Sequence, residues 1–230
     1  MLILIFDISK LDSQIIDYVF LDRIPSYRLK TKNKSDIQKS INSLKLLKIG
    51  LNEFGIDLLN EDLVYNEFGR PNLKREDIFF NISHSGKYIT CAISNKMIGI
   101  DIQKHIEKFE EIIPFFSTSE QEYLASISLH KILIKEFFKI WTVKESYLKF
   151  LGNGLYKELD SFSLFLDMKQ IIDGDQIVKG ILYKNFSISE EYTMSVVSSF
   201  DDNYEIRYVD PKILTCQVSS PVPANIFLIS

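Results

Sequence analysis

The chain has 230 residues, of which 46% are hydrophobic and 25% are charged, and its formal net charge is −4. This length suits one large domain or two small ones, and the composition is that of an ordinary globular protein with a real core. The charge excludes a globally basic nucleic-acid binder, and no stretch approaches the ~20 apolar residues that a membrane-spanning helix needs.

The N-terminal segment MLILIFDISK is predicted to be a β-strand. It lacks the basic start and the small-residue cleavage site of a secretory signal. Cys91 and Cys216 stand far apart, and Cys91 lies in the apolar run YITCAIS. We therefore expect buried thiols in a reducing compartment, with the cytoplasm as the location, rather than a disulfide framework.

Apolar residues at helical spacing predict an amphipathic helix over residues 35–55, capped by Ser35 or Asp36 and stopped by Gly55. A shorter helical pattern precedes it at 13–24. Between residues 23 and 48 eight basic side chains face the single acid Asp36, and this pattern fits either a solvated cationic helix face or a site for a polyanion. The basic residues are Arg23, Arg28, Lys30, Lys32, Lys34, Lys39, Lys45 and Lys48.

Short β segments follow at 63–73, broken by a Gly-Arg-Pro turn, and at 78–83 and 88–94, which form a predicted hairpin. From residue 97 the same order of elements begins again. It comprises a strand at 97–103, helices at 116–127 and 131–151, and strands at 161–166, 177–185, 192–199 and 204–210. The chain has no internal sequence repeat, so two related halves with a boundary near residues 95–96 are an expectation from element order alone.

In the strand at 97–103, three isoleucines alternate with Gly99, Asp101 and Gln103. The isoleucines are predicted to be buried, and Asp101 and Gln103 to share the opposite face, with roots about 7 Å apart. Their oxygens could address one hard cation, and Gly99 leaves room for a close approach to the backbone. The alternative is that this polar face is simply hydrated.

In the helical segment WTVKESYLKF, Lys144 falls among apolar residues on a helical wheel, and Glu145 and Lys149 lie at the edge, four residues apart. Glu145 and Lys149 could form a common surface ion pair, and Lys144 could extend its ammonium to solvent. If instead an anion meets both lysines while Glu145 joins Asp101 on a cation, every charge has a partner. That arrangement indicates a Mg²⁺-bound phosphate or pyrophosphate.

The segment FNISHSGKY places Ser83 and His84 at a strand end, with hydroxyl, imidazole and backbone donors suited to phosphate. A lone histidine is more often structural. The chain has no Cys-x-x-Cys pair, no Gly-x-Gly-x-x-Gly and no P-loop motif, which argues against a zinc site, a dinucleotide fold and a P-loop NTPase.

Five motifs, in order and spacing, closely resemble the 4′-phosphopantetheinyl transferases of the surfactin-synthetase-activating (Sfp) type. They are FGRP, FNISHSGKY, IGIDIQ, FSTSEQEYL and WTVKESYLKFLGNGL, and the match spans about residues 66–166. The resemblance implies an α+β fold, a pseudo-twofold monomer of two similar halves, each a small antiparallel sheet packed on a long helix. The expected division is 1–95, 96–210 with the metal site, and a C-terminal strand or tail at 211–230.

The resemblance also implies transfer of the phosphopantetheine arm of coenzyme A to a serine of an apo acyl- or peptidyl-carrier protein, with release of adenosine 3′,5′-bisphosphate. Asp101 and Glu145 would bind Mg²⁺, with Mn²⁺ as the alternative, and Gln103 stands at a third ligand position. Glu145 would also accept the serine proton, and Lys149 would hold the pyrophosphate and protonate the leaving group. The other implied contacts to coenzyme A phosphates are Lys39, Ser40, Arg70, Ser83, His84 and Lys144, with His84 at the 3′-phosphate.

Two residues depart from the commonest family pattern: Gln103 replaces a second acid, and Arg70 replaces a frequent lysine.

The expected partners are coenzyme A and an acidic carrier protein of fatty acid, polyketide or nonribosomal peptide biosynthesis, with no nucleic acid and no membrane. Two other functions stay open, a Mg²⁺-dependent phosphohydrolase of nucleotides and a non-catalytic module that binds polyanions.

Overall fold

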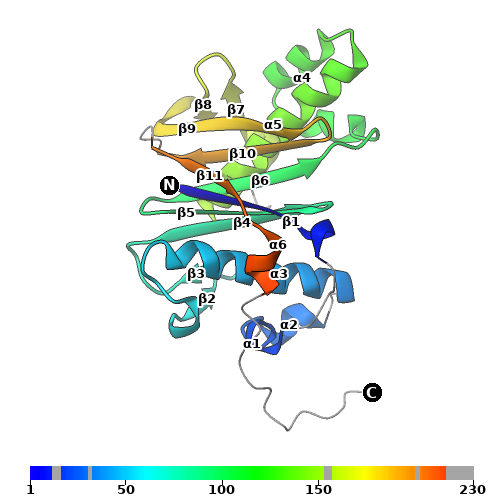
Figure 1. Ribbon diagram of the computed structural model, residues 1–230. Helices are drawn as coiled ribbons and strands as arrows, with labels where there is room; N and C mark the ends of the chain where they lie inside the picture. The colour runs from blue at the N-terminus through cyan, green and yellow to red at the C-terminus, as the bar shows by residue number, and fades with distance from the viewer. Residues whose placement is uncertain (12–16, 31–32, 153–156, 200–202, 216–230) are drawn as a thin grey trace.

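A computed structural model describes residues 1–11, 17–30, 33–152, 157–199 and 203–215. The described chain forms four layers, which are a long helix, a four-stranded sheet, a five-stranded sheet and a second long helix (Figure 1). The predicted α+β class is confirmed, and a twofold relation between the two halves stays a prediction.

The first sheet has the strand order β11-β1-β5-β4, and helix α3 covers its outer face (Figure 1). Its strands are β1 (Leu2–Asp7), β4 (Phe79–Ser85), β5 (Tyr88–Ser94) and β11 (Glu205–Tyr208). Helix α3 (Lys34–Asn52) lies where the amphipathic pattern predicted it. Its cap differs from the prediction, because the Asn33 side chain accepts the Asp36 N–H at 2.9 Å. An asparagine two or three residues earlier therefore takes the role expected of Ser35 or Asp36.

Short elements surround this half. They are η1 (Ile8–Lys10), α1 (Tyr18–Leu21), α2 (Ser26–Leu29), η2 (Leu58–Asn60), β2 (Leu63–Tyr65) and β3 (Pro71–Leu73). Strands β2 and β3 pair antiparallel on either side of the predicted turn.

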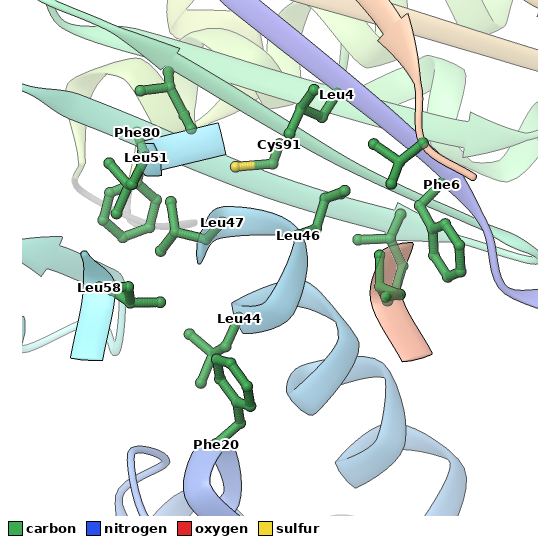
Figure 2. Close-up of a cluster of buried hydrophobic side chains, with 14 of the residues drawn as sticks. Leu4, Phe6, Phe20, Leu44, Leu46, Leu47, Leu51, Leu58, Phe80 and Cys91 are labelled. Atoms are coloured by element: carbon green, nitrogen blue, oxygen red, sulfur yellow. The ribbon is translucent and has the colours of Figure 1, made fainter. Parts of the chain in front are cut away.

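The core of the first half lies between α3 and the sheet, where leucines of the helix meet side chains of β1 and β5 (Figure 2). Leu4 and Cys91 come from neighbouring strands and are fully buried. Cys91 is a free thiol, as predicted, and its burial raises its pKa well above the ordinary value. Cys216 lies outside the described residues.

The second sheet is antiparallel throughout, with the order β6-β10-β9-β8-β7. Its strands are β6 (Ile98–Lys104), β7 (Phe162–Phe165), β8 (Gln170–Asp173), β9 (Gln176–Ser189) and β10 (Tyr192–Ser198), and the helical elements of this half are η3 (Glu110–Phe115), α4 (Thr118–Ala125), α5 (His130–Leu151) and η5 (Leu159–Ser161). The sequence prediction missed β8, a four-residue strand. Helix α5 packs on the outer face of this sheet through a core of aromatic and aliphatic side chains.

The two sheets are joined at two places. Ile98, Ile100 and Ile102 pack against Ile3 and Ile5 of the first sheet, which confirms the predicted burial of the isoleucines. At the adjoining edges, β4 side chains accept hydrogen bonds from β6 main-chain N–H groups. Those bonds run from Ile100 to Asn81 (3.0 Å), from Ile102 to Ser83 (3.3 Å) and from Lys104 to Ser85 (3.0 Å). The N–H groups along this edge of β6 thus bind side chains of β4 instead of the main chain of another strand.

The C-terminal part departs from the predicted division. The chain passes from the first sheet to the second between Ser94 and Ile98, but β11 returns to the first sheet and pairs in parallel with β1. The first sheet is therefore mixed rather than wholly antiparallel, and residues 205–208 pack with the N-terminal half. Pro211–Thr215 form the short helix α6 where a strand or tail was expected, and residues 216–230 lie outside the described chain.

Gly99 allows α5 to lie directly against β6. A Cβ atom at this position would lie 1.9 Å from the main-chain oxygen of Ser146 and 2.6 Å from the main-chain nitrogen of Phe150. Both atoms belong to the helix backbone, so neither can move without moving α5. The predicted close approach at Gly99 is therefore present, and the approaching group is the helix that carries Glu145 and Lys149.

We expect Gly99→Ala to lower the free energy of unfolding by about 3 kcal/mol, because α5 must move away from β6 to admit the methyl group. Urea denaturation of both proteins measures this difference. Gly174→Ala is the control, since nothing lies within 4 Å of its Cβ position and only its φ of +59° carries a cost, about 1 kcal/mol. Equal losses for the two variants would contradict the close packing at Gly99.

Candidate active site

Asp101 is the centre of a charged cluster between β4, β6 and α5. Its side chain is 2% exposed. The Lys149 ammonium lies 2.7 Å from Asp101 Oδ1, and the Ser83 hydroxyl donates to the same oxygen at 2.7 Å. The strand and the helix that the sequence assigned to one site therefore do meet.

Glu145 lies one helical turn before Lys149, on the same side of α5. Burial, together with the nearby negative charge of Asp101, raises the pKa of Glu145 to about 7, although Lys149 opposes the shift. Two carboxylates thus share a poorly solvated space with a single ammonium, and near neutral pH Glu145 can gain or lose a proton.

The oxygen chemistry of this cluster fits a hard divalent cation. Such ions prefer carboxylate oxygens, and a cation between Asp101 and Glu145 would relieve their mutual repulsion. The described residues contain no group of three or more His, Cys, Asp or Glu side chains arranged for a metal. Further ligands within the described chain would have to be neutral oxygens, water or a substrate phosphate.

Gln103 supports Asp101 in this structure. Its amide nitrogen donates to Asp101 Oδ2 at 3.1 Å, and its amide oxygen accepts from the Ser85 hydroxyl at 3.3 Å. Its expected role as a third metal ligand stays a prediction, because the amide oxygen has a second lone pair and Asp101, the first proposed ligand, has protein partners here as well. Ser85 was not among the predicted site residues, although its alternation with Ser83 along β4 was a usable signal.

Lys144 requires a correction. Its side chain is fully buried, and its ammonium lies 2.8 Å from Glu120 Oε2. It also donates to the main-chain oxygens of Leu159 (2.8 Å) and Phe162 (2.7 Å). These partners use all three N–H bonds of the ammonium, so Lys144 is not placed to contact a phosphate. The positive charge on the apolar side of α5 is therefore neutralised by Glu120, which was not among the predicted site residues.

Comparison with known proteins identifies the family. The model of the 4′-phosphopantetheinyl transferase superfamily matches residues 97–206. A 4′-phosphopantetheinyl transferase of Bacillus subtilis is 31% identical over 175 residues, which cover 74% of this chain and 78% of that relative. The chain belongs to the 4′-phosphopantetheinyl transferase superfamily.

Two other relatives show that this chain is similar in sequence to transferases of the predicted Sfp type. The transferase gsp of Aneurinibacillus migulanus is 38% identical over 120 residues, and Sfp of Bacillus subtilis strain 168 is 34% identical over 140 residues. These alignments cover 51% and 59% of this chain, and they span 50% of gsp and 62% of Sfp. The predicted family is confirmed.

Arg70 of the transferase ties the β2–β3 turn to the end of α5. Its guanidinium donates to the main-chain oxygen of Lys149, and more weakly to those of Phe80 (3.5 Å) and Ile98 (3.4 Å). Burial lowers its pKa. Asn66, which the sequence analysis overlooked, adds a second tie by donating to the Gly152 oxygen at 2.9 Å. In this structure Arg70 contacts carbonyl groups rather than presenting an open fork to a phosphate.

A small pocket of about 210 Å³ lies beside Arg70 and Lys149. It is lined mainly by apolar groups of the two halves, and Arg70 Nε is buried there without a hydrogen-bond partner among the described residues. The lining residues are Phe68, Gly69, Arg70, Pro71, Phe80, Asn81, Ile82, Leu148, Lys149 and Gly152.

The remaining predicted phosphate contacts lie elsewhere. His84 is exposed and points to the face of β4 opposite Ser83, because side chains alternate along a strand. Lys39 and Ser40 lie on α3. The Lys39 ammonium is 3.6 Å from the Asp36 carboxylate, and the Ser40 hydroxyl donates to the main-chain oxygen of Asp36. Ser83 joins the Asp101 cluster, whereas His84, Lys39 and Ser40 lie on the α3 side of the first sheet.

The basic region at 23–48 is partly structural. Arg23 donates to the main-chain oxygens of Leu59 (2.7 Å) and Glu61 (3.1 Å). Lys45 is buried in an ion pair with Asp17 at 3.0 Å. These two cations are therefore not available to a polyanion, although Lys30 and Lys34 are exposed. No helix in the described ranges is long and apolar enough to cross a bilayer.

The raised pKa of Glu145 predicts a pH-dependent stability of the metal-free protein. Between the ordinary pKa of 4.5 and the folded value of about 7, the folded chain keeps a proton that the unfolded chain releases. Stability must therefore fall as pH rises through this window, and Glu145→Gln should remove that loss, adding at most about 3 kcal/mol at pH 8. Urea denaturation with a chelator at several pH values measures this effect.

The matched control is Glu122→Gln, an exposed change on α4. It should leave the pH dependence of the free energy of unfolding unaltered. If the free energy of unfolding depends on pH in the same way for Glu145→Gln and the starting chain, the half-buried, poorly solvated position of the Glu145 carboxyl beside Asp101 is contradicted.

Proposed function

We propose that this transferase moves the 4′-phosphopantetheine arm of coenzyme A to a serine hydroxyl of an apo acyl- or peptidyl-carrier protein. The other product is adenosine 3′,5′-bisphosphate. Family membership supports this reaction, and the observation that carries it in this chain is the contact of Lys149 with Asp101 at 2.7 Å beside Glu145. An anionic diphosphate and a divalent cation together would satisfy this mixed cluster.

In the proposed site, Asp101 and Glu145 would hold Mg²⁺, or Mn²⁺ as the alternative. The cation would neutralise part of the negative charge of the diphosphate. Gln103 and Ser83 fix the orientation of the Asp101 carboxylate by donating to its two oxygens. Holding the reacting groups in a fixed geometry is a large part of catalysis in phosphoryl transfer.

The proton transfers follow from the charges of the two α5 residues. Glu145 accepts the proton of the serine hydroxyl as that oxygen bonds to the phosphorus atom. The bond from phosphorus to the bridging oxygen breaks, and Lys149 donates a proton to the departing phosphate oxygen. The chain needs no nucleophile of its own, because the attacking hydroxyl arrives on the carrier protein.

The outer surfaces have proposed roles as well. His84, Lys39 and Ser40 would contact the 3′-phosphate of coenzyme A, and exposed cations of the basic region would meet coenzyme A or the acidic carrier protein. We further propose that the transferase acts in the cytoplasm, a reducing compartment that suits the free, buried thiol of Cys91. We also propose that it is a monomer without nucleic acid or membrane partners.

The reaction can be tested by measuring the mass of an apo carrier protein after incubation with coenzyme A, Mg²⁺ and the transferase. We expect a gain of one phosphopantetheine group per carrier. Asp101→Ala and Glu145→Ala should each lower the rate by at least about 100-fold, because each removes a charged group that acts on the transferred phosphate.

Asp175→Ala is the matched control, an exposed acid in the turn between β8 and β9, and it should keep the full rate. Unmodified carrier with every substrate tested would contradict the proposal. Release of phosphate from coenzyme A without carrier would instead identify a phosphohydrolase that uses water as the attacking group.

A further inference from the structure

The ion pair between Glu120 and Lys144 is buried more deeply than Glu145 and Lys149, the two charged residues that α5 contributes to the active site. The two side chains are 1% and 0% exposed, and they come from different helices, α4 and α5. The Lys144 ammonium also lies over the Phe162 ring, 4.2 Å from its centroid. Removing two charges from water is costly, and apolar residues of the same volume often stabilise a fold equally well. A contribution to stability is therefore a weak explanation for the pair.

Glu120 connects three elements through its two carboxylate oxygens. Oε2 meets Lys144 of α5 and accepts the Ser117 N–H at 3.0 Å, which closes the first turn of α4. Oε1 accepts the Leu164 N–H of β7 at 3.0 Å. Lys144 completes the connection through the main-chain oxygens of Leu159 in η5 and of Phe162, the first residue of β7. Each of these bonds is directional, so together they fix the rotation of α5 about its axis.

That rotation decides where the neighbouring residues of α5 point. Successive helical residues are turned by about 100°, so Glu145 and Lys149 lie about 100° and 140° around the axis from Lys144. When Lys144 points to α4 and β7, Lys149 reaches β6 and meets Asp101. Gly99 sets the distance between α5 and β6 from the other side. The helix is thus held at one distance by Gly99 and at one rotation by Lys144.

We propose that Glu120 and Lys144 are positioning residues, which set the rotation of α5 that brings Glu145 and Lys149 to Asp101, and that neither contacts coenzyme A. This inference rests on the proposed transferase function of the Asp101 cluster. It replaces a direct phosphate contact of Lys144 by an indirect role through the helix that carries it.

The test is the double variant Glu120→Leu/Lys144→Met, which removes both charges and keeps an apolar volume. We expect the affinity for coenzyme A, measured by calorimetry, to stay within about threefold, and kcat for carrier modification to fall about 10- to 100-fold, as for a small misplacement of reacting groups. A crystal structure of the variant should show Lys149 Nζ separated from Asp101, in contrast to the 2.7 Å contact of the starting chain.

The matched control is Asp17→Leu/Lys45→Met, which removes another buried ion pair, from the first half of the molecule. It should leave kcat unchanged. Glu120→Gln keeps the shape of the side chain and is the second variant if the double variant does not fold. It should lower kcat in the same direction with the affinity for coenzyme A retained.

Two results would overturn the proposal. A fall of tenfold or more in affinity for coenzyme A, with Lys149 still on Asp101, would mean that Lys144 binds the substrate. An unchanged kcat in a folded variant would mean that the pair serves stability alone. If the starting chain modifies no carrier, the proposed function fails, whereas the crystal structure of the variant still tests the rotation of α5.

Discussion

The structure depends on the burial of Asp101 between two edge strands and a helix. A carboxylate that is 2% exposed must be balanced by donors, and this one receives Lys149, Ser83 and Gln103. The three donors come from α5, β4 and β6, so the same residue that would act on a phosphate also joins both halves of the molecule. Asp101 therefore matters both for the stability of the fold and for the proposed chemistry, because a buried carboxylate without partners would destabilise the contact between the two halves and the site itself.

The surrounding packing keeps that arrangement in place. Gly99 admits the backbone of α5, and polar side chains of β4 accept the free N–H groups of β6. Arg70 and Asn66 hold the C-terminal end of α5 through its main-chain oxygens. These contacts act on the backbone rather than on the charged groups, which leaves Glu145 and Lys149 to respond to a bound anion or cation.

Much of the fold could be predicted from periodicity. The period-two alternation in IGIDIQ separated buried isoleucines from Asp101 and Gln103, and the helical spacing located α3 and α5 within a few residues. Strand β8 was not predicted, because its sequence QIID places two isoleucines side by side instead of alternating apolar and polar residues. The return of β11 to the first sheet could not be foreseen, since pairing with β1 is a contact across almost the whole chain.

The site was predicted in part, for a physical reason. Spacing along one strand or one helix tells which residues share a face, and so Asp101, Glu145 and Lys149 were grouped correctly. It does not tell which distant residue neutralises a buried charge, and Lys144 was therefore assigned to a phosphate although Glu120 meets it. Gln103 and Arg70 have partners that spacing also does not reveal, a carboxylate and main-chain oxygens that only the folded chain brings near, and their roles toward the metal and the phosphates stay predictions.

The central claim is that Asp101 and Glu145 share one cation when coenzyme A binds. Calorimetry of Mg²⁺ and coenzyme A binding at pH 6, in buffers with different ionisation enthalpies, counts the protons released. At this pH the Glu145 carboxyl is mostly protonated, so the account predicts release of about one proton by the starting chain, and none from this position in Glu145→Gln. Equal proton release by the two proteins would contradict it.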